Sequence, residues 1–157
     1  KGSSLKSALL KIESKDQAES SGPQGEFILP KDKTFPVAFI AGGIGITPFR
    51  SMIKHLLETE EKRDITLFYS NKTLQDIAFK ELFEKARMIG VKTVYIINAR
   101  GERIDKNMIK EKLPDYKRRI FYVSGPEPMV EVFKKMLSEM KPRDIKTDYF
   151  SGYSANN

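Results

Sequence analysis

The clearest pattern in this chain is an alternation between continuous apolar runs and segments in which apolar residues recur every three or four positions. The alternation starts near residue 35 and continues almost to the end of the 157 residues. A short apolar run is typical of a strand that is buried on both faces, as in a parallel sheet. The pattern therefore predicts strands at residues 37–41, 65–69, 91–97, 120–123 and 145–150.

The segments between these strands predict amphipathic helices. In the first segment, apolar side chains follow the i, i+3, i+4, i+7 spacing of one helix face. Thr47 is placed to cap this helix, and Pro48 suits its first turn. The other helices are predicted at residues 79–86, with Gly90 after the end, from Asp105 to just before Pro114, and at residues 129–140.

Strands that alternate with helices predict an α/β fold. Because crossovers between parallel strands are right-handed, the helices should cover both faces of a doubly wound parallel sheet. We assign this domain to residues 35–157. The part before it is expected to hold a short helix at residues 4–12, a polar loop at residues 14–25 and a short strand at residues 26–30.

Four turns follow the predicted strands and contain polar residues or glycine. In a parallel sheet such turns share the edge formed by the carboxyl ends of the strands, which is where ligands bind. We therefore expect the four turns to lie together, although they are far apart in the sequence. They comprise residues 42–47, 70–72, 98–100 and 124–128.

The turn at residues 42–48 reads Gly-Gly-Ile-Gly-Ile-Thr-Pro. It follows a buried strand and opens a helix, so its free backbone amides and the positive end of the helix favour a pyrophosphate. The usual dinucleotide fingerprint has a third glycine where Pro48 stands, and the Gly-Lys-Ser/Thr ending of a P-loop is missing. The alternative interpretation is a tight turn that requires small residues for packing alone.

Ser70 and Lys72 end the second strand, where an NAD-preferring site would carry a carboxylate for the ribose. A hydroxyl and a cation suit a 2′-phosphate instead, so NADPH is slightly favoured over NADH. A polar loop tip without a ligand is the alternative. Arg100, in the third turn, is a further candidate for binding the cofactor.

The fourth turn begins at Ser124 and exposes its backbone. Gly125 would let a ligand approach closely, and Pro126 would fix the direction of the chain. The alternative is that this turn serves only to begin the next helix.

Composition limits the chemistry that the chain can perform. The absence of cysteine and the single histidine exclude disulfides, thiolate metal sites and clusters of several histidines. His55 is interpreted as a surface or packing residue. No spacing suggests a catalytic triad or a pair of carboxylates for acid–base work. We therefore predict no metal site and expect a cofactor to carry any chemistry.

The formal net charge of +7 favours anionic partners. The basic residues alternate with acids along the chain, so we interpret most of them as solvated surface and do not expect nucleic acid as a partner; a basic nucleic-acid-binding domain is the rival interpretation. No apolar run reaches the roughly 20 residues that span a bilayer, so no membrane segment is predicted. The absence of cysteine fits a reducing compartment, and we expect the protein in the cytoplasm.

Four motifs occur together in the order typical of one family. They are residues 41–48, residues 69–73 with 76–79, residues 123–129 and residues 148–153. Together they resemble the ferredoxin–NADP reductase superfamily of flavin-dependent reductases.

This resemblance implies contacts with each part of a nicotinamide cofactor. The residues implied at the pyrophosphate and nicotinamide are Gly43, Gly45, Ile46, Thr47 and Pro48. Those implied at the adenosine ribose or its 2′-phosphate are Ser70 and Lys72. Those implied on the nicotinamide side are Gly125, Pro126, Glu127 and Met129. Phe150 would lie near a flavin ring, and Thr47, Ser124 and Phe150 would lie near the path of a hydride.

The sequence departs from the family pattern at three places. Lys72 stands where many members have arginine, and the loss of the planar guanidinium weakens the NADP prediction. Ser124 stands where many members have cysteine. The family also has a flavin-binding β-barrel before the nucleotide domain, and the Arg-x-Tyr-Ser-like strand of that barrel does not occur here. Residues 1–34 resemble the C-terminal remnant of such a barrel.

The predicted function is that of the NAD(P)H-binding domain of a flavin-dependent reductase. The resemblance implies that the parent protein passes a hydride from the nicotinamide to FAD or FMN, and electrons from there to an acceptor. We expect the partners to be the dinucleotide, the missing flavin domain and an unidentified electron acceptor. We also expect this chain by itself to be inactive as a reductase. The alternative is a nucleotide-binding or regulatory module without a redox role.

Overall fold

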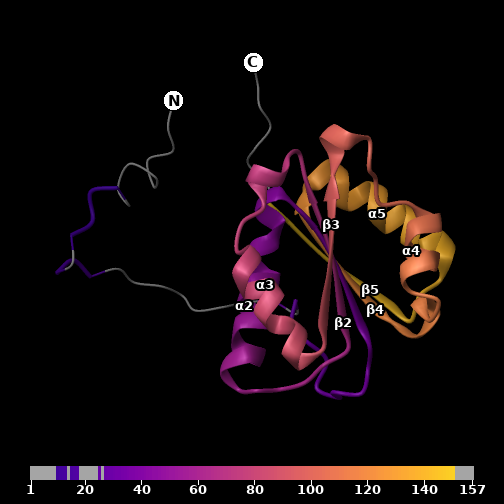
Figure 1. Ribbon diagram of the computed structural model, residues 1–157, viewed down its shortest axis with the longest axis horizontal. Coiled ribbons are helices and arrows are strands. Elements are labelled where there is room, and N and C mark those ends of the chain that lie inside the picture. The colour runs from indigo at the N-terminus through magenta and orange to yellow at the C-terminus, as the bar shows by residue number, and fades with distance from the viewer. Residues whose placement is uncertain (1–9, 14, 18–24, 26, 151–157) are drawn as a thin grey trace.

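The computed structural model describes residues 10–13, 15–17, 25 and 27–150. Its centre is a five-stranded sheet in the order β3-β2-β1-β4-β5, and every neighbouring pair of strands is parallel. The predicted α/β fold with a parallel sheet is therefore confirmed (Figure 1). The strands are β1 (Val37–Gly42), β2 (Ile65–Asn71), β3 (Val91–Ile97), β4 (Ile120–Pro126) and β5 (Asp144–Phe150).

Helices cover both faces of this sheet, with α2 and α3 on one side and α4 and α5 on the other (Figure 1). In the described part of the chain the α-helices are α2 (Ile46–Glu58), α3 (Lys80–Lys85), α4 (Lys106–Lys112) and α5 (Glu127–Met140). Short 3-10 helices are η1 (Gly43–Gly45), η2 (Leu74–Asp76), η3 (Ala86–Ile89), η4 (Asn98–Arg100) and η5 (Tyr116–Arg118).

The middle strand β1 is buried along its whole length. Successive side chains of a strand point to opposite faces. Phe39 therefore packs with Phe49 and Ile53 of α2, whereas Ile40 belongs to the core beneath α4 and α5. The uninterrupted apolar run of β1 thus supplies both cores at once, which explains why it does not alternate with polar residues.

Aromatic rings join the segment before β1 to the core on the α2 side. The rings of Phe39 and Phe49 are stacked with their centroids 4.4 Å apart, and Phe27 contacts both Phe49 and Tyr122. The Tyr122 hydroxyl donates a hydrogen bond to the carbonyl oxygen of Ile28 at 2.7 Å. Burial raises the pKa of Tyr122 to about 12, so this hydroxyl keeps its proton at neutral pH.

A buried arginine fastens the amino ends of three strands. Arg119, just before β4, donates hydrogen bonds to both carboxylate oxygens of Asp64, at 2.9 and 3.2 Å. It also donates to Asp115 at 2.8 Å and to the carbonyl oxygen of Val37 at 3.2 Å. Burial acts to raise the pKa of Asp115, but the hydrogen bond and the charge of Arg119 outweigh it and hold that pKa below its usual value.

The predictions for the segment before β1 are only partly testable. The strand predicted at residues 26–30 is wrong for its described part, because residues 27–30 are not in a strand. A strand needs a hydrogen-bonded neighbour, and this segment meets the domain through the ring of Phe27 and the carbonyl of Ile28 instead. The helix predicted at residues 4–12 lies largely outside the described residues, and residues 10–12 are not helical. The division at residue 34 and the barrel remnant stay predictions.

Candidate functional site

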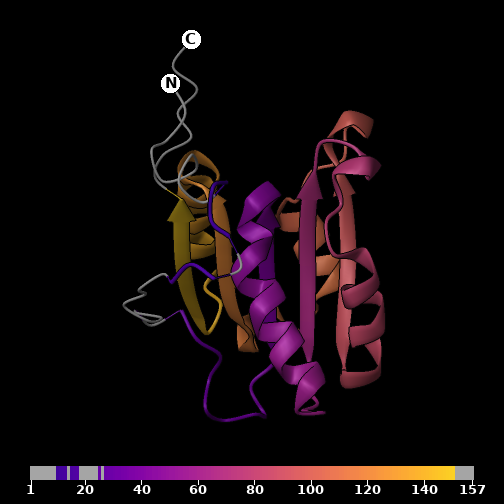
Figure 2. The ribbon, with the colours of Figure 1, turned by 90° about the vertical axis from the view of Figure 1, so that its left-hand side faces the viewer.

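All five strands run in one direction, so their carboxyl ends form a single edge of the sheet (Figure 2). The four turns predicted to share this edge meet around a cleft of about 770 Å³. The lining residues are Gly42, Gly43, Ile44, Ile46, Thr47, Tyr69, Ser70, Asn71, Lys72, Asp76, Ala78, Phe79, Asn98, Pro126 and Met129.

The glycines of the first turn are needed for two different reasons. Gly43 has a positive φ of 53°, and a Cβ placed there would meet nothing within 4 Å, so its backbone is open. In contrast, a Cβ on Gly45 would overlap the carbonyl oxygen of Ser124 and lie 2.6 Å from the Cα of Gly125. The tight-turn interpretation therefore explains Gly45, whereas Gly43 leaves exposed backbone at the cleft.

The start of α2 corrects one prediction. Thr47 does not cap the helix; the N-cap is Gly45, which has no side chain to accept from the first amides. The Thr47 hydroxyl donates instead to the carbonyl oxygen of Ile44 at 3.0 Å. The helix begins one residue before Thr47, so its hydroxyl faces the preceding turn and leaves the amide groups of the helix start without a side-chain partner. Pro48 lies in the first turn, as predicted.

The end of β2 is held in place by hydrogen bonds to its neighbours. The Ser70 hydroxyl donates to Oδ1 of Asn98 at 3.2 Å, and the carbonyl of Lys72 accepts from the backbone of Ala99 at 3.0 Å. Within the described residues the ammonium group of Lys72 has no ion-pair partner. The backbone of this turn is thus fixed, while its cation remains available to a ligand.

The carboxylate nearest in sequence to Lys72 has another role. Asp76 closes a capping box at η2, where its Oδ2 accepts from the backbone amide and the hydroxyl of Thr73, both at 2.8 Å. The following loop is anchored to the sheet because the backbone amide of Ala78 donates to the hydroxyl of Tyr69 at 3.4 Å. Burial raises the pKa of Tyr69, which keeps this hydroxyl neutral.

The turn after β4 packs directly against the glycine turn. A Cβ on Gly125 would lie 2.7 Å from Cε of Met129 and 3.3 Å from the carbonyl oxygen of Gly42. Pro126 and Met129 line the cleft. Ser124 is fully buried, and its Oγ has no hydrogen-bond partner among the described residues.

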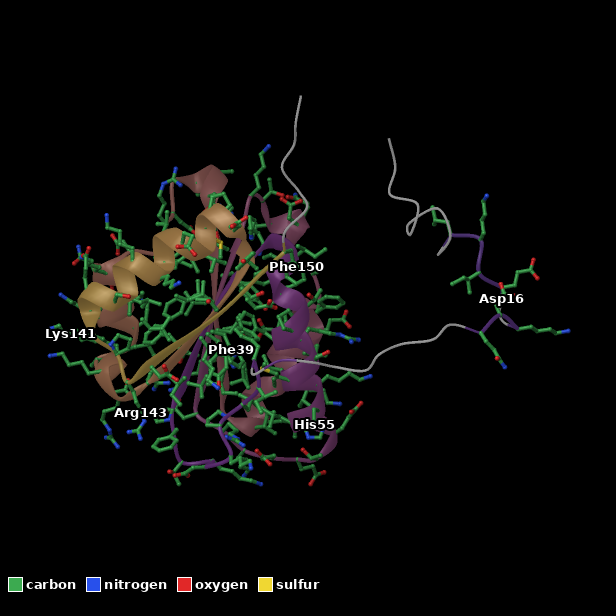
Figure 3. The ribbon with its side chains drawn as sticks, turned by 180° about the vertical axis from the view of Figure 1, so that it is seen from behind. Asp16, Phe39, His55, Lys141, Arg143 and Phe150 are labelled. Atoms are coloured by element: carbon green, nitrogen blue, oxygen red, sulfur yellow. The ribbon has the colours of Figure 1, made fainter. Side chains whose placement is uncertain are left out.

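The structure brings about half of the predicted site residues to the cleft. Those that line it are Gly43, Ile46, Thr47, Ser70, Lys72, Pro126 and Met129, and those that do not are Gly45, Pro48, Arg100, Ser124, Gly125, Glu127 and Phe150. Phe150, 37% exposed, ends β5, and Figure 3 shows it at the opposite end of the domain from His55. The assigned roles of all these residues stay predictions.

Sequence reasoning missed one wall of the cleft. Tyr69, Asp76, Ala78 and Phe79 line it, although they were quoted only as part of a family motif. The residue types at these positions do not indicate a ligand. Only their position at or just after the end of β2 could have predicted that they lie at this edge of the sheet. Asn98 belonged to a predicted turn but was not singled out.

The described residues provide neither a metal site nor a membrane span. Among them, no group of three or more His, Cys, Asp or Glu side chains is arranged to hold a metal ion. No helix in that part of the chain is both long enough and apolar enough to cross a membrane.

Comparison with known proteins gives one family match. The family described as "Oxidoreductase NAD-binding domain" matches residues 39–135. Every residue that lines the cleft falls within this match.

Curated relatives are longer than this chain. The reductase component of propane 2-monooxygenase from Rhodococcus jostii (strain RHA1) is 27% identical over 137 residues, covering 78% of this chain and 36% of that protein. A flavohemoprotein from Bacillus thuringiensis subsp. konkukian (strain 97-27) is 28% identical over 150 residues, covering 86% of this chain and 37% of that protein. The chain therefore spans somewhat more than a third of the length of these relatives.

Solved structures share the fold. The Amycolatopsis cytochrome P450 reductase GcoB has a TM-score of 0.67 at 24% identity, over 82% of this chain and 42% of that chain. A ferredoxin-NADP+ reductase from Plasmodium falciparum with 2'P-AMP has a TM-score of 0.59 at 20% identity, over 81% of this chain and 58% of that chain. At such identities the similarity demonstrates a common fold.

Proposed function

We propose, because this chain belongs to the oxidoreductase NAD-binding domain family, that it holds NADPH in its cleft and presents it to a flavin within a larger reductase. The chain is an NAD(P)-binding domain of the type found in FAD-containing reductases, so the resemblance carried by its motifs is confirmed. The hydride transfer, the coenzyme preference and the electron acceptor are parts of the proposal.

The start of α2 is the observation that carries the proposal. Its first amides have no side-chain cap, its first turn contains no acidic residue, and the backbone of Gly43 lies open beside it. The amide of Ile46 already donates back to the carbonyl oxygen of Gly43, so the open backbone of Gly43 and the positive end of the helix dipole are what favour an anion here. These residues fit a pyrophosphate, and the cleft of about 770 Å³ leaves room for the groups on either side of it.

The end of β2 favours the 2′-phosphate of NADPH. Lys72 supplies a cation without an ion-pair partner in the described chain, and Asp76 is engaged by Thr73. Ser70 adds a hydroxyl that is oriented by Asn98. The related fold from Plasmodium falciparum is described with 2'P-AMP, which is the phosphate-bearing half of such a coenzyme.

The other end of the cleft is proposed to hold the nicotinamide. Pro126 and Met129 provide an apolar wall there, and Ser124 lies buried behind the turn. When bound, the reduced nicotinamide supplies a hydride, which we propose passes to FAD or FMN and from there as electrons to an acceptor. The contribution of this chain is to orient the coenzyme, because a hydride travels only about 3–3.5 Å between aligned atoms.

Calorimetric titration of the chain with NADPH and NADH in parallel tests this function. We expect both to bind and NADPH to bind more tightly. Lys72→Ala should weaken the binding of NADPH about tenfold, or about 1.4 kcal/mol, and leave the binding of NADH unchanged. Lys110→Ala removes an exposed lysine from α4 on the other face of the sheet and should alter neither affinity. Absence of binding by either coenzyme would overturn the proposal.

A further inference from the structure

Phe79 is held in an unfavourable backbone conformation at the cleft. It adopts the left-handed region, with φ 58° and ψ 28°, at the residue that precedes α3. Side chains other than glycine, asparagine and aspartate rarely occupy this region, and such conformations persist where the surroundings enforce them. Strained residues of this kind are often found at binding sites. The turn of the chain into α3 is therefore not by itself a sufficient explanation of the conformation of Phe79.

Packing into the core does not provide that explanation. The side chain of Phe79 is 44% exposed and belongs to neither apolar core, although its neighbour Ile77 packs against the core on the α2 side. Among the described residues, no other aromatic ring contacts it. The ring instead forms part of the cleft wall.

The conformation of Phe79 is fixed from three directions. Before it, the capping box of Asp76 and the hydrogen bond from Ala78 to Tyr69 hold the loop. After it, the Phe79 carbonyl accepts from the amide of Phe83, at 3.3 Å, which binds it to the first turn of α3. Beside it, the guanidinium carbon of Arg50 lies 5.2 Å from the ring centroid.

Arg50 covers the ring from outside the cleft, since it is not among the residues that line the cleft. Its Nε is buried and has no hydrogen-bond partner in the described chain, so the ring is its identified contact. A cation held against one face of an aromatic ring is attracted by the π electrons and keeps the ring in place. The part of Phe79 that lines the cleft then remains available to a flat ligand.

We propose that Phe79 is the platform on which the adenine of the dinucleotide stacks. The inference rests on the proposed function, which places the adenosine half beside Ser70 and Lys72. Phe79 lines the same cleft as those two residues, on the loop that follows β2. A rigid exposed ring suits adenine because every base offers a flat π face and stacking requires no particular hydrogen bond.

Calorimetry of the full chain with ADP-ribose, which contains adenine but no nicotinamide, tests this platform. Phe79→Leu keeps an apolar side chain but removes the ring. It should lower the affinity for ADP-ribose roughly 5- to 100-fold. Phe79→Tyr retains the ring and should bind within about twofold of the wild type. Leu74→Ala, an exposed apolar residue of the same loop that does not line the cleft, should leave the affinity unchanged.

Phe79→Gly separates the platform from a structural role. Glycine adopts the left-handed region without strain, which offsets the lost contact with Arg50, so the urea midpoint of this variant should stay close to that of the wild type. Its affinity for ADP-ribose should nevertheless fall as far as that of Phe79→Leu.

The outcomes separate this inference from the proposed function. If the wild type binds NADPH but Phe79→Leu binds ADP-ribose equally well, the platform is wrong and the function stands. If Leu74→Ala loses as much affinity as Phe79→Leu, the effect belongs to folding of the loop and the platform is likewise overturned. If the wild type binds none of NADPH, NADH and ADP-ribose, both proposals fall.

Discussion

At the carboxyl edge of the sheet, the role of each glycine depends on the atoms that surround it. Gly43, Gly45 and Gly125 look alike in the sequence, yet the structure gives them different tasks. Gly45 and Gly125 let two turns pack against each other, whereas Gly43 adopts a positive φ beside open space. Only Gly43 thus combines exposed backbone with the conformational freedom that glycine alone provides without strain.

Gly45→Ala should be more damaging to stability than Gly43→Ala. The new Cβ at Gly45 would overlap the backbone of Ser124 and lie 2.6 Å from Cα of Gly125, neither of which can rotate away. We expect a loss of about 3 kcal/mol, as for severe overpacking. Gly43→Ala has room for its Cβ and should cost about 1 kcal/mol for the left-handed conformation. Urea denaturation measures both, and equal losses would contradict the packing argument.

At the scale of elements, local chemistry predicted several boundaries correctly. Gly90 ends η3 with a φ of 92°, as expected for a residue that must turn the chain out of a helix. Asp105 caps α4, with its carboxylate accepting from the amide of Met108 at 2.8 Å. Thr47 failed as a cap although its residue type is equally suitable, because the packed glycine turn starts α2 earlier.

Removal of the Asp105 cap should destabilise α4. Asp105→Ala leaves the amide of Met108 without its acceptor and should lower the free energy of unfolding by about 1 kcal/mol. Asp105→Asn keeps an acceptor oxygen and should lie within a few tenths of a kcal/mol of the wild type. Urea denaturation at neutral pH distinguishes them. If both variants were equally unstable, the effect would come from the lost charge and not from the cap.

The arginine that fastens β1, β2 and β4 predicts a dependence of stability on pH. Arg119→Met removes the donor from Asp64 and Asp115 and should cost about 2 kcal/mol at pH 7. Because Arg119 lowers the pKa of Asp115 in the folded state, its stabilisation is present above the unfolded pKa of about 3.9 and is lost as pH falls through the lowered value.

The difference in free energy of unfolding between the wild type and Arg119→Met should therefore become smaller below about pH 4. Urea denaturation of both proteins at about pH 7 and about pH 3 provides the measurement. A gap of the same size at both values would show that the ion pair contributes nothing that depends on the charge of Asp115.

At the scale of the whole molecule, we expect this chain to bind the coenzyme without oxidising it, because the proposed function leaves the flavin to another domain. The described cleft provides for a dinucleotide, and the flavin-binding motif of the family does not occur among these 157 residues. We expect the purified chain to bind NADPH and yet not oxidise it, as followed by the absorbance of the reduced nicotinamide. Heat-treated protein with the same NADPH serves as the control. Rapid oxidation without added flavin would overturn this expectation.

The positions of the strands were predictable because burial leaves a direct trace in the sequence. The apolar runs of β1, β2 and β4 matched strands whose residues are almost all buried. The segment at residues 27–30 has a similar local composition but forms no strand. A segment forms a strand only where another strand lies beside it to accept and donate hydrogen bonds. That neighbour comes from a distant part of the chain and cannot be predicted from the local pattern.

The order of the elements, the parallel sheet, the edge where the turns meet and the family could all be predicted from the amino-acid sequence alone. Each of these follows from periodicity, residue type or motif order. The three-dimensional arrangement was needed to show which residues at that edge line the cleft and which serve packing. The pairing of Gly42 with Ser70, and of Ala41 with Ser124, brings together turns that are remote in sequence. Whether a side chain there faces a ligand or a neighbouring turn depends on how closely residues from distant parts of the chain pack against it, which no local pattern records.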